Sequence, residues 1–260
     1  MRGPIIVMNH LDLCSGIGGF SIAAEHIGFR TIGFSEINPF CSRVLQRHWP
    51  HVFNYGDIRN VIVCLDTIHV LTAGLPCQPY SVAGKQRGNA DPRHLWPEFM
   101  RIARSFKPRN ILVENVPGLV AMELDNILAD LEGEAYTCGA FIIPACAANA
   151  PHRRDRLWIV AHSLRERRSS WLDIVSERFI SLMQDWDVET YKAEWSNVQS
   201  DTWTAMQAEN WLSFNADASR TNDGISDRVE RIRAGGNSIV PAVAYPLLKF
   251  IYELERLNDA

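Results

Sequence analysis

The sequence predicts an α/β fold, with a mixed, mostly parallel sheet that carries helices on both faces. Short apolar runs typical of strands alternate with helical stretches through the first 162 of the 260 residues. A glycine-rich turn follows the first run, and a cysteine flanked by proline and glutamine follows the third. Such alternation is typical of parallel sheets whose strands are connected by helices.

Six runs are expected to be strands and four stretches to be helices. The strands are expected at 10–15, 31–37, 69–75, 109–116, 137–145 and 156–162. The helices are expected at 18–28, 40–49, 95–106 and, with Pro241 in the first turn, within the closing segment 235–257. No helical pattern separates the last two strands, so we expect an antiparallel pair at one edge of the sheet. The apolar stripe of the closing helix should pack on the main domain.

The segment after His162 differs from the rest in composition. Residues 163–222 are polar and acidic, and they hold five of the eight tryptophans. We therefore expect a main domain formed by 1–162 and 228–260, and a small second lobe at 163–227. The tryptophans are interpreted as the core of this lobe in preference to a base-stacking surface.

Charge is distributed unevenly along the chain. The 26 basic and 30 acidic residues give a net charge of −4, which by itself argues against a nucleic-acid-binding protein. Of these, 6 basic and 12 acidic residues lie from Ser163 to Asp227, which leaves 20 and 18 elsewhere. The basic clusters at 151–156 and 228–233 could contact phosphates, although a solvated charged face also explains each cluster taken alone.

Several classes of protein are disfavoured. No apolar run is long enough to span a bilayer, and the first ten residues lack the features of a secretory signal. The six cysteines form no C-x-x-C pair, which favours a reducing cytoplasm. The eight histidines have no metal-ligand spacing, so no metal site is expected.

The glycine-rich turn in "LDLCSGIGGF" indicates a ligand site. Gly16, Gly18 and Gly19 lie between a strand and a helix, where backbone can approach a ligand and helix N–H groups are free. Ser21 stands where the dinucleotide fingerprint requires a third glycine. A nucleoside is therefore favoured over a dinucleotide, and a plain tight turn remains the alternative.

Three carboxylates accompany this turn. Glu36 ends the second expected strand, where it can accept both hydrogens of a ribose diol. Asp57 could accept a hydrogen bond from an adenine amino group, and Asp12, just before the turn, suits an amino group better than a pyrophosphate. Together with the turn, these carboxylates make nucleoside binding the preferred interpretation.

Cys77 differs from the other five cysteines in its surroundings. It follows the third expected strand at its carboxyl end, in a loop stiffened by Pro76 and Pro79. Burial in the core is the usual explanation for a lone cysteine, but a core residue does not require such a loop. A rigidly held, reactive thiol does, and Gly84 and Gly88 would let the following loop move.

Seven short segments, in order along the chain, resemble the motifs of the cytosine-C5 DNA methyltransferases. They are "DLCSGIGGF", "SEINPF", "GDI", "GLPCQPYS", "ENVPGL", "PHRRDRLWIV" and "GGNSIVPAVA". The resemblance implies a Rossmann-like, class I S-adenosylmethionine-dependent methyltransferase fold in which 163–227 is a short target-recognition segment. It also implies methyl transfer from S-adenosylmethionine to C5 of cytosine in double-stranded DNA, at a specific short sequence.

The resemblance assigns the catalytic residues as well. Cys77 would add as a thiolate to cytosine C6, and Glu114 would protonate or hydrogen-bond N3. Arg156 would contact O2, while Asn115 would order the loop and Arg154 would support the phosphate or the loop.

The remaining implied residues belong to the cofactor site and to the DNA contact. The cofactor set is Asp12, Cys14, Ser15, Gly16, Gly18, Gly19, Phe20, Glu36, Ile37, Asp57, Ile58, Gly74, Pro76, Asn237, Ser238 and Ile239. The cytosine must be flipped out of the duplex to be reached. The loop expected to close over it carries Gln78, which is assigned to the catalytic set. The residues expected to contact DNA are Ser81, Lys85 and Arg87 on the same loop, and Arg153. Cys14 stands where most relatives have a phenylalanine beside the cofactor adenine, so stacking there is expected to be weaker or supplied elsewhere.

Partners and alternatives complete the expectation. We expect a monomer, with a cognate restriction endonuclease as a candidate partner, and the compact size resembles phage or prophage enzymes. The alternatives are an RNA methyltransferase of the same fold, a catalytically inactive DNA-binding relative and a nicotinamide oxidoreductase. The intact Cys77, Glu114 and Arg156 argue against the inactive relative, and Ser21 argues against the oxidoreductase.

Overall fold

The computed structural model describes residues 7–62, 67–76, 95–148, 153–164, 234 and 237–258. Within these ranges seven strands form one sheet in the order β3-β2-β1-β4-β5-β7-β6. The parallel strands are β1 (Met8–Leu13), β2 (Phe29–Ser35), β3 (Phe53–Asn54), β4 (Val70–Gly74) and β5 (Asn110–Asn115). Strand β7 (Asp155–Ser163) runs antiparallel to both β5 and β6 (Tyr136–Pro144). The predicted mostly parallel sheet and its antiparallel edge pair are confirmed.

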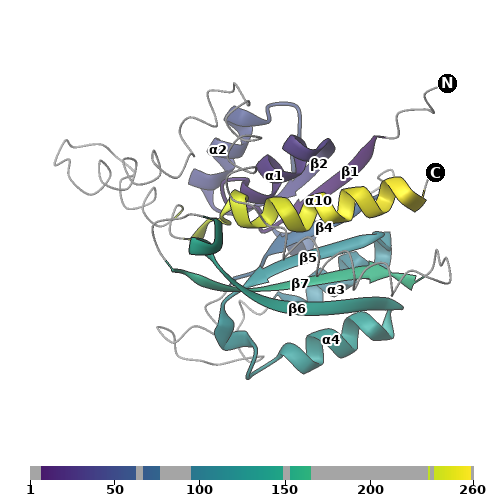
Figure 1. The fold of residues 1–260 in the computed structure, drawn as a ribbon. Coiled ribbons are helices and arrows are strands. Elements are labelled where there is room, and N and C mark those ends of the chain that lie inside the picture. Colours follow the sequence, from purple (N-terminus) through teal and green to yellow (C-terminus); the bar gives the residue numbers. More distant parts are fainter. Residues whose placement is uncertain are drawn as a thin grey trace.

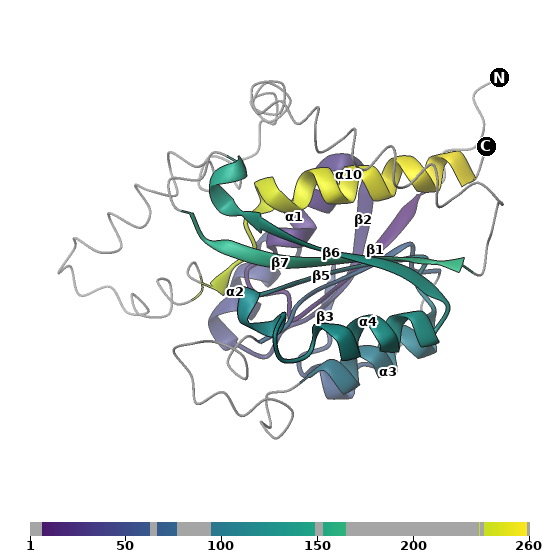
Figure 2. The same ribbon diagram turned by 60° about the horizontal axis from the view of Figure 1, so that its bottom comes forward.

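Helices cover both faces of the sheet. Figures 1 and 2 show α1 (Gly19–Ile27) and α10 (Pro241–Asn258) on one face, and α3 (Trp96–Phe106) and α4 (Leu124–Gly133) on the other. Helix α2 (Pro39–His48) follows β2, and the short 3-10 helices are η1 (Ile58–Asn60), η3 (Pro117–Leu119) and η4 (Ala145–Ala148). The four predicted helices correspond to α1, α2, α3 and α10. Helix α4 has no predicted counterpart, because it lacks a side-chain N-cap and buries only Ile127 and Leu131.

The strands alternate between two buried cores. On β1, Leu11 and Leu13 belong to the core under α3 and α4, whereas Met8 belongs to the core under α1 and α10. Strand β4 repeats the alternation with Leu71 and Val70. Strands that are buried on both faces are held firmly, so their carboxyl ends form a rigid edge.

Helix α10 is fastened to the sheet by a buried polar cluster. The carboxylate of Glu255, which is 0% exposed, accepts hydrogen bonds from Arg109 at 2.9 Å and Asn110 at 2.7 Å. The side-chain oxygen of Asn110 also lies 2.8 Å from Nδ1 of His162 on β7. The closing helix thus packs on the main domain, as predicted, and it lies against α1.

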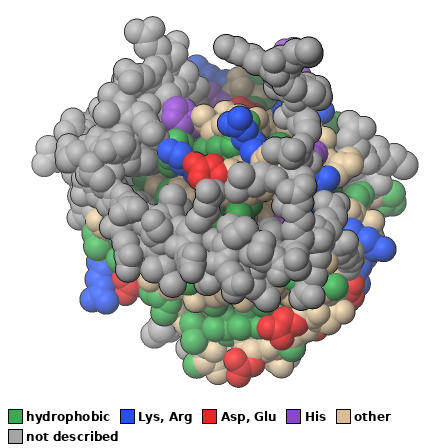
Figure 3. All heavy atoms as spheres, turned by 45° about the vertical axis from the view of Figure 1, so that its right-hand side comes forward, with side chains coloured by type: hydrophobic (Ala, Val, Ile, Leu, Met, Phe, Trp, Pro, Cys, Tyr) green, Lys and Arg blue, Asp and Glu red, His purple; other side chains and the backbone are tan. Residues whose placement is uncertain are grey.

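The surface of the described residues carries charges of both signs. On the face in Figure 3, several Lys and Arg side chains lie next to Asp or Glu side chains. Ion pairs of helix α3 join Arg101 to Glu98 and Arg104 to Glu134, each at 2.8 Å. No helix in the described ranges is long and apolar enough to cross a membrane. Apart from its first two residues, the predicted lobe at 163–227 lies outside the described residues and stays a prediction.

Candidate active site

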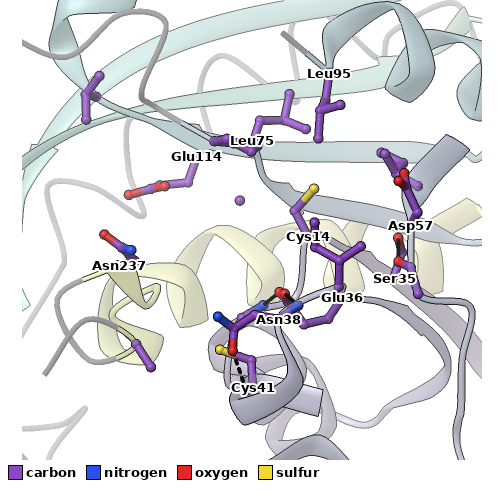
Figure 4. Close-up of a pocket in the computed structure, with 18 of the residues that line it drawn as sticks. Cys14, Ser35, Glu36, Asn38, Cys41, Asp57, Leu75, Leu95, Glu114 and Asn237 are labelled. Carbon is purple, nitrogen blue, oxygen red and sulfur yellow. Dashed lines mark hydrogen bonds between the residues drawn. The ribbon is translucent and has the colours of Figure 1, made fainter. Parts of the chain in front are cut away.

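A cavity of about 440 Å³ lies at the edge where the parallel strands end. Open α/β sheets bind their ligands at this edge, and the volume is in the range of small-molecule sites. In Figure 4, Glu114 and Asn237 lie at one end of the cavity, Asp57 and Ser35 lie at the other, and the Cys14 side chain points between them.

The cavity brings together predicted site residues from distant parts of the chain. Those that line it are Cys14, Gly16, Glu36, Ile37, Asp57, Ile58, Gly74, Pro76, Glu114, Arg154, Arg156 and Asn237. They come from the ends of β1, β2, β4 and β5, from η1, from the start of β7 and from the segment before α10. Parallel strands deliver their carboxyl ends to one edge, which is why motifs far apart in the sequence meet here.

Glu36 anchors the glycine-rich turn to the end of β2. Its Oε2 accepts the N–H of Gly16 at 2.7 Å, and its Oε1 accepts the N–H of Asn38 at 2.7 Å. Burial raises the pKa of Glu36, while these backbone hydrogen bonds favour the charged form. Each carboxylate oxygen can accept a second hydrogen bond, so Glu36 retains acceptor capacity toward the cavity.

Two glycines expose their backbone to the cavity near Glu36 and Asp57. Gly16 and Gly56 line it with φ of 55° and 72°, and apart from the glycine itself and its two neighbours in the chain, no heavy atom lies within 4 Å of the place where a Cβ would stand on either. Asp57 caps η1, accepting the N–H of Arg59 at 2.9 Å and its guanidinium at 3.1 Å. Carboxylate acceptors beside exposed backbone fit a nucleoside with a ribose diol.

The structure places Asp12 away from the cavity, contrary to the prediction. Its carboxylate is 0% exposed and accepts hydrogen bonds from Thr72 at 2.7 Å and Ser21 at 3.0 Å. The alternation of β1 turns this side chain into the core under α1 instead of beyond the strand end. Burial raises the pKa of Asp12 to about 7. Asp12 supports the turn from below, and its carbonyl accepts the Ser15 hydroxyl at 2.7 Å.

Replacing Asp12 by asparagine is expected to change how stability depends on pH. The folded protein keeps this proton above the pH at which the unfolded chain releases it, so the contribution of Asp12 to the free energy of unfolding falls between about pH 4 and about pH 7. Asparagine can still bond both hydroxyls without titrating. When the pH is raised from 5 to 8, the free energy of unfolding of Asp12→Asn, measured with urea, should increase by more than about 1 kcal/mol relative to that of the wild type. A difference that does not vary with pH would contradict this account.

Further predicted cofactor residues build the wall without lining the cavity. Gly19 allows the chain before α10 to approach, because a Cβ there would lie 2.7 Å from the carbonyl oxygen of Ile239. Phe20 is 1% exposed and packs edge-on against Trp158, with ring centroids 5.9 Å apart. None of Gly19, Phe20 and Ile239 lines the cavity, so their contact with a cofactor stays a prediction. The same holds for Ser15, Gly18 and Ser238.

An ion pair occupies the other end of the cavity. Nε of Arg156, near the start of β7, lies 2.9 Å from Oε1 of Glu114, at the end of β5. Because β7 runs antiparallel to β5, it begins at the edge where β5 ends. Burial raises the pKa of Glu114 to about 7, against the opposing effect of Arg156 and Arg154. A carboxyl group with a pKa near neutrality can both hold and release a proton under physiological conditions.

The other two arginines of this motif have different surroundings. Arg154 has a φ of 34°, which is rare outside glycine, and donates to the carbonyl of Ser238 at 3.0 Å. It thereby ties the start of β7 to the segment before α10. Arg153 is exposed, does not line the cavity and pairs with Asp155 at 3.0 Å.

Asn115 connects β5 to the end of β4. Its side chain is buried, donates to the carbonyl of Leu75 at 3.5 Å and accepts the N–H of Val116 at 2.8 Å. Leu75 precedes Cys77 by two residues. Asn115 therefore holds the backbone that leads to the predicted nucleophile.

The predicted loop residues Cys77, Gln78, Ser81, Lys85 and Arg87 lie outside the described residues, so their roles stay predictions. Pro76 and Leu95, the nearest described residues on either side, both line the cavity. Within the described ranges, no group of three His, Cys, Asp or Glu side chains could hold a metal ion.

Some lining residues are not among those predicted. They are Ser35, Asn38, Cys41, Gly56, Arg59, Leu75, Leu95, Val116 and Ala234. The Asn38–Pro39 pair carries a usable signal, because it is typical of a helix start and Asn38 indeed caps α2. Leu75 and Leu95 carry none, since an apolar residue at a strand or helix end is ordinary.

Comparisons with known proteins agree with this geometry. The family model described as C-5 cytosine-specific DNA methylase matches residues 8–233. The type II methyltransferase M.HgiCII of Herpetosiphon aurantiacus is 32% identical over 158 residues, which is 58% of this chain and 36% of that protein. A DNA N-6-adenine-methyltransferase of Escherichia phage P1 is 39% identical over 142 residues, 47% of this chain and 19% of that protein. The match thus spans well under half the length of either relative.

Solved structures agree on the fold. A putative DNA modification methyltransferase encoded within a prophage of E. coli superposes with a TM-score of 0.62 at 16% identity, covering 96% of this chain and 99% of the other. The sheet order is that of a Rossmann-like, S-adenosylmethionine-dependent methyltransferase fold. The chain belongs to the C-5 cytosine-specific DNA methylase family.

Proposed function

We propose that this chain transfers a methyl group from S-adenosylmethionine to C5 of cytosine in double-stranded DNA, at a specific short sequence. The observation that carries the proposal is a single cavity with nucleoside-type acceptors at one end and the buried Glu114–Arg156 pair at the other. A methyl donor bound at the first end and a pyrimidine at the second would meet inside it. Family membership supports the same reaction.

The first end of the cavity suits the cofactor. Glu36 would accept the ribose hydroxyls, Asp57 would accept the adenine amino group, and the open backbone at Gly16 allows close approach. None of the described lining residues is aromatic, so the adenine would lie against aliphatic side chains such as Ile37 and Ile58. When bound, S-adenosylmethionine supplies an electrophilic methyl group.

The second end suits the base. The thiolate of Cys77 would form a bond to C6, which makes C5 nucleophilic enough to accept the methyl group. The addition makes N3 basic, and the proton held by Glu114 would go to N3. Arg156 would donate to O2. After the methyl group has passed to C5, S-adenosylhomocysteine is left as the product of the donor. Loss of the C5 proton to water then expels the Cys77 thiolate and restores the C5–C6 double bond, and the N3 proton returns to Glu114.

Neighbouring residues would keep these groups in place. Asn115 holds the carbonyl of Leu75, two residues before Cys77, and Arg154 fixes the segment before α10 through Ser238. Neither role requires contact with the reacting atoms. Both would be positioning roles in the proposed reaction.

The DNA itself would be held mainly by residues outside the described ranges. The target base must be flipped out to reach the cavity. Ser81, Lys85 and Arg87, with the exposed Arg153, would contact the backbone, and 163–227 would select the sequence. We propose a monomer that works in the cytoplasm of a bacterial cell or a phage-infected host, with a restriction endonuclease as a candidate partner.

The test identifies the methylated base. Purified chain is incubated with S-adenosylmethionine carrying a labelled methyl group and, in parallel reactions, with duplex DNA or with transfer RNA, and the nucleosides are identified by mass spectrometry. We expect label in 5-methylcytosine, and bisulfite sequencing would give its sequence context. Label in N6-methyladenine, the product named for the phage relative, or only in transfer RNA, would overturn the proposal.

A further inference from the structure

Arg101 lies behind the cavity wall and makes an unusual set of contacts with it. From helix α3, its Nη2 donates to the carbonyl of Ile58 at 2.9 Å and to that of Arg59 at 3.3 Å. Its Nη1 donates to the carbonyl of Val61 at 3.1 Å, and its Nε donates to Glu98 at 2.8 Å. One guanidinium therefore bonds three carbonyls of η1 and its C-cap residue.

The short helix η1 forms few hydrogen bonds within itself in the part of the chain that the structure describes. It is three residues long, and the N–H of Val61 reaches the carbonyl of Ile58 only at 3.3 Å. The last carbonyls of any helix lack partners within it, and a cation suits their partial negative charge. The Ile58 and Val61 side chains are 2% and 1% exposed, so the backbone of η1 is anchored to the core next to α3. Arg101 supplies the partners that the helix cannot.

The opposite side of η1 forms the cofactor end of the cavity. Asp57, which caps η1, and Ile58 and Arg59 within it all line the cavity, whereas Arg101 does not. Figure 4 places Asp57 at the end far from Glu114 and Asn237. A shift of η1 would move Asp57 directly, because its carboxylate accepts the N–H of Arg59.

We infer that Arg101 is a positioning residue for cofactor recognition, and that it holds η1 so that Asp57 can select the adenine amino group. The inference rests on the proposed function, since it takes the ligand to be an adenosyl compound. Arg101 touches neither cofactor nor substrate. Its effect should therefore appear in cofactor affinity and selectivity and not in the chemical step.

The experiment compares two cofactor products by isothermal titration calorimetry. One is S-adenosylhomocysteine, and the other is its inosine analogue, which has an oxygen in place of the adenine amino group. We expect Arg101→Met to bind S-adenosylhomocysteine about tenfold more weakly than the wild type. Its preference for the adenosine compound should also shrink. At saturating S-adenosylmethionine, kcat should stay within about twofold of the wild type while KM rises.

Matched variants separate positioning from general destabilisation. Arg101→Lys retains the charge and can bond one or two carbonyls, so it should recover part of the affinity and of the preference. Arg104→Met removes the neighbouring arginine of α3, which pairs with Glu134 and does not contact η1. It should bind both compounds as the wild type does. If Arg101→Met does not fold, the ratio of the affinities of Arg101→Lys for S-adenosylhomocysteine and its inosine analogue still tests the inference.

The possible failures are distinct. If the wild type binds neither compound, the proposed function fails together with the inference. If the wild type prefers S-adenosylhomocysteine and both Arg101 variants keep that preference unchanged, the inference fails and the proposed function stands. A fall in affinity that is equal for the two compounds would also overturn the inference, because it would mean that Asp57 is held without Arg101.

Discussion

Replacing Cys77 by serine is expected to abolish methyl transfer to DNA while leaving affinity for S-adenosylmethionine nearly unchanged. A serine hydroxyl is scarcely ionised at neutral pH and is a far weaker nucleophile than a thiolate, so C6 addition would stop. Binding should persist, because the cofactor end of the cavity is built by Gly16, Glu36 and Asp57. The measurements are labelled methyl incorporation and calorimetric titration with S-adenosylhomocysteine.

A second cysteine provides the control for this variant. Cys146 is exposed on η4 and does not line the cavity, so Cys146→Ser should methylate DNA at the wild-type rate. The wild type and Cys146→Ser should also form a covalent adduct with duplexes that contain 5-fluorocytosine, because fluorine cannot leave C5 as a proton does. Cys77→Ser should form none. Unchanged turnover in Cys77→Ser, or free DNA only with the wild type, would end the case for thiolate addition.

Replacing Glu114 by glutamine is expected to lower kcat by about 10²–10⁴-fold, the usual contribution of a general acid or base. The amide can still accept a hydrogen bond from Arg156, so the ion-pair geometry is largely kept. It cannot deliver a proton to N3. Single-turnover methylation at saturating DNA and cofactor isolates this step from substrate binding.

The pH profile gives an independent test of Glu114. With its pKa raised to about 7, the carboxyl group is increasingly protonated below that pH and loses its proton above it. The single-turnover rate of the wild type should therefore fall as the pH rises above about 7, whereas Glu114→Gln should lose this decline. Glu134→Gln, which alters a partner of Arg104 away from the cavity, should behave as the wild type. A loss below tenfold, or an unchanged profile, would remove Glu114 from the proton transfer.

Much of the architecture follows from local pattern. The strands β1, β2, β4, β5 and β7 were predictable because buried strands read as apolar runs, and β6 because it is rich in β-branched and aromatic residues. The helices α2, α3 and α10 were predictable from an amphipathic stripe, and α1 from the glycines that flank it. The two-residue strand β3 and the helix α4 were not, since neither has a strong local signal. Many of the polar residues expected at strand ends meet at one cavity, because the topology carries those ends to one edge; their roles stay predictions.

Asp12 illustrates the limit of that reasoning. In the sequence, a polar residue within the last positions of a strand cannot be told from one that follows the strand. In the structure, the alternation of side chains can point the former into the core, whereas the latter faces the ligand site. Contacts between distant elements are also invisible to local pattern. Arg154 meets Ser238 across 84 residues, and Arg101 meets Ile58 across 43, and only the packed structure reveals either pair.

The segment that carries Ala234 and Asn237 is synthesised after every other part of the described cavity wall. On the ribosome, a growing chain that already contains the glycine-rich turn and the Glu114–Arg156 pair would still lack this side of the pocket and the helix whose Glu255 fastens it. Completion of the wall thus coincides with the end of translation of this region. A chain cut short before Ala234 would therefore hold the residues of the cofactor end, Gly16, Glu36 and Asp57, but would lack the wall beside Glu114.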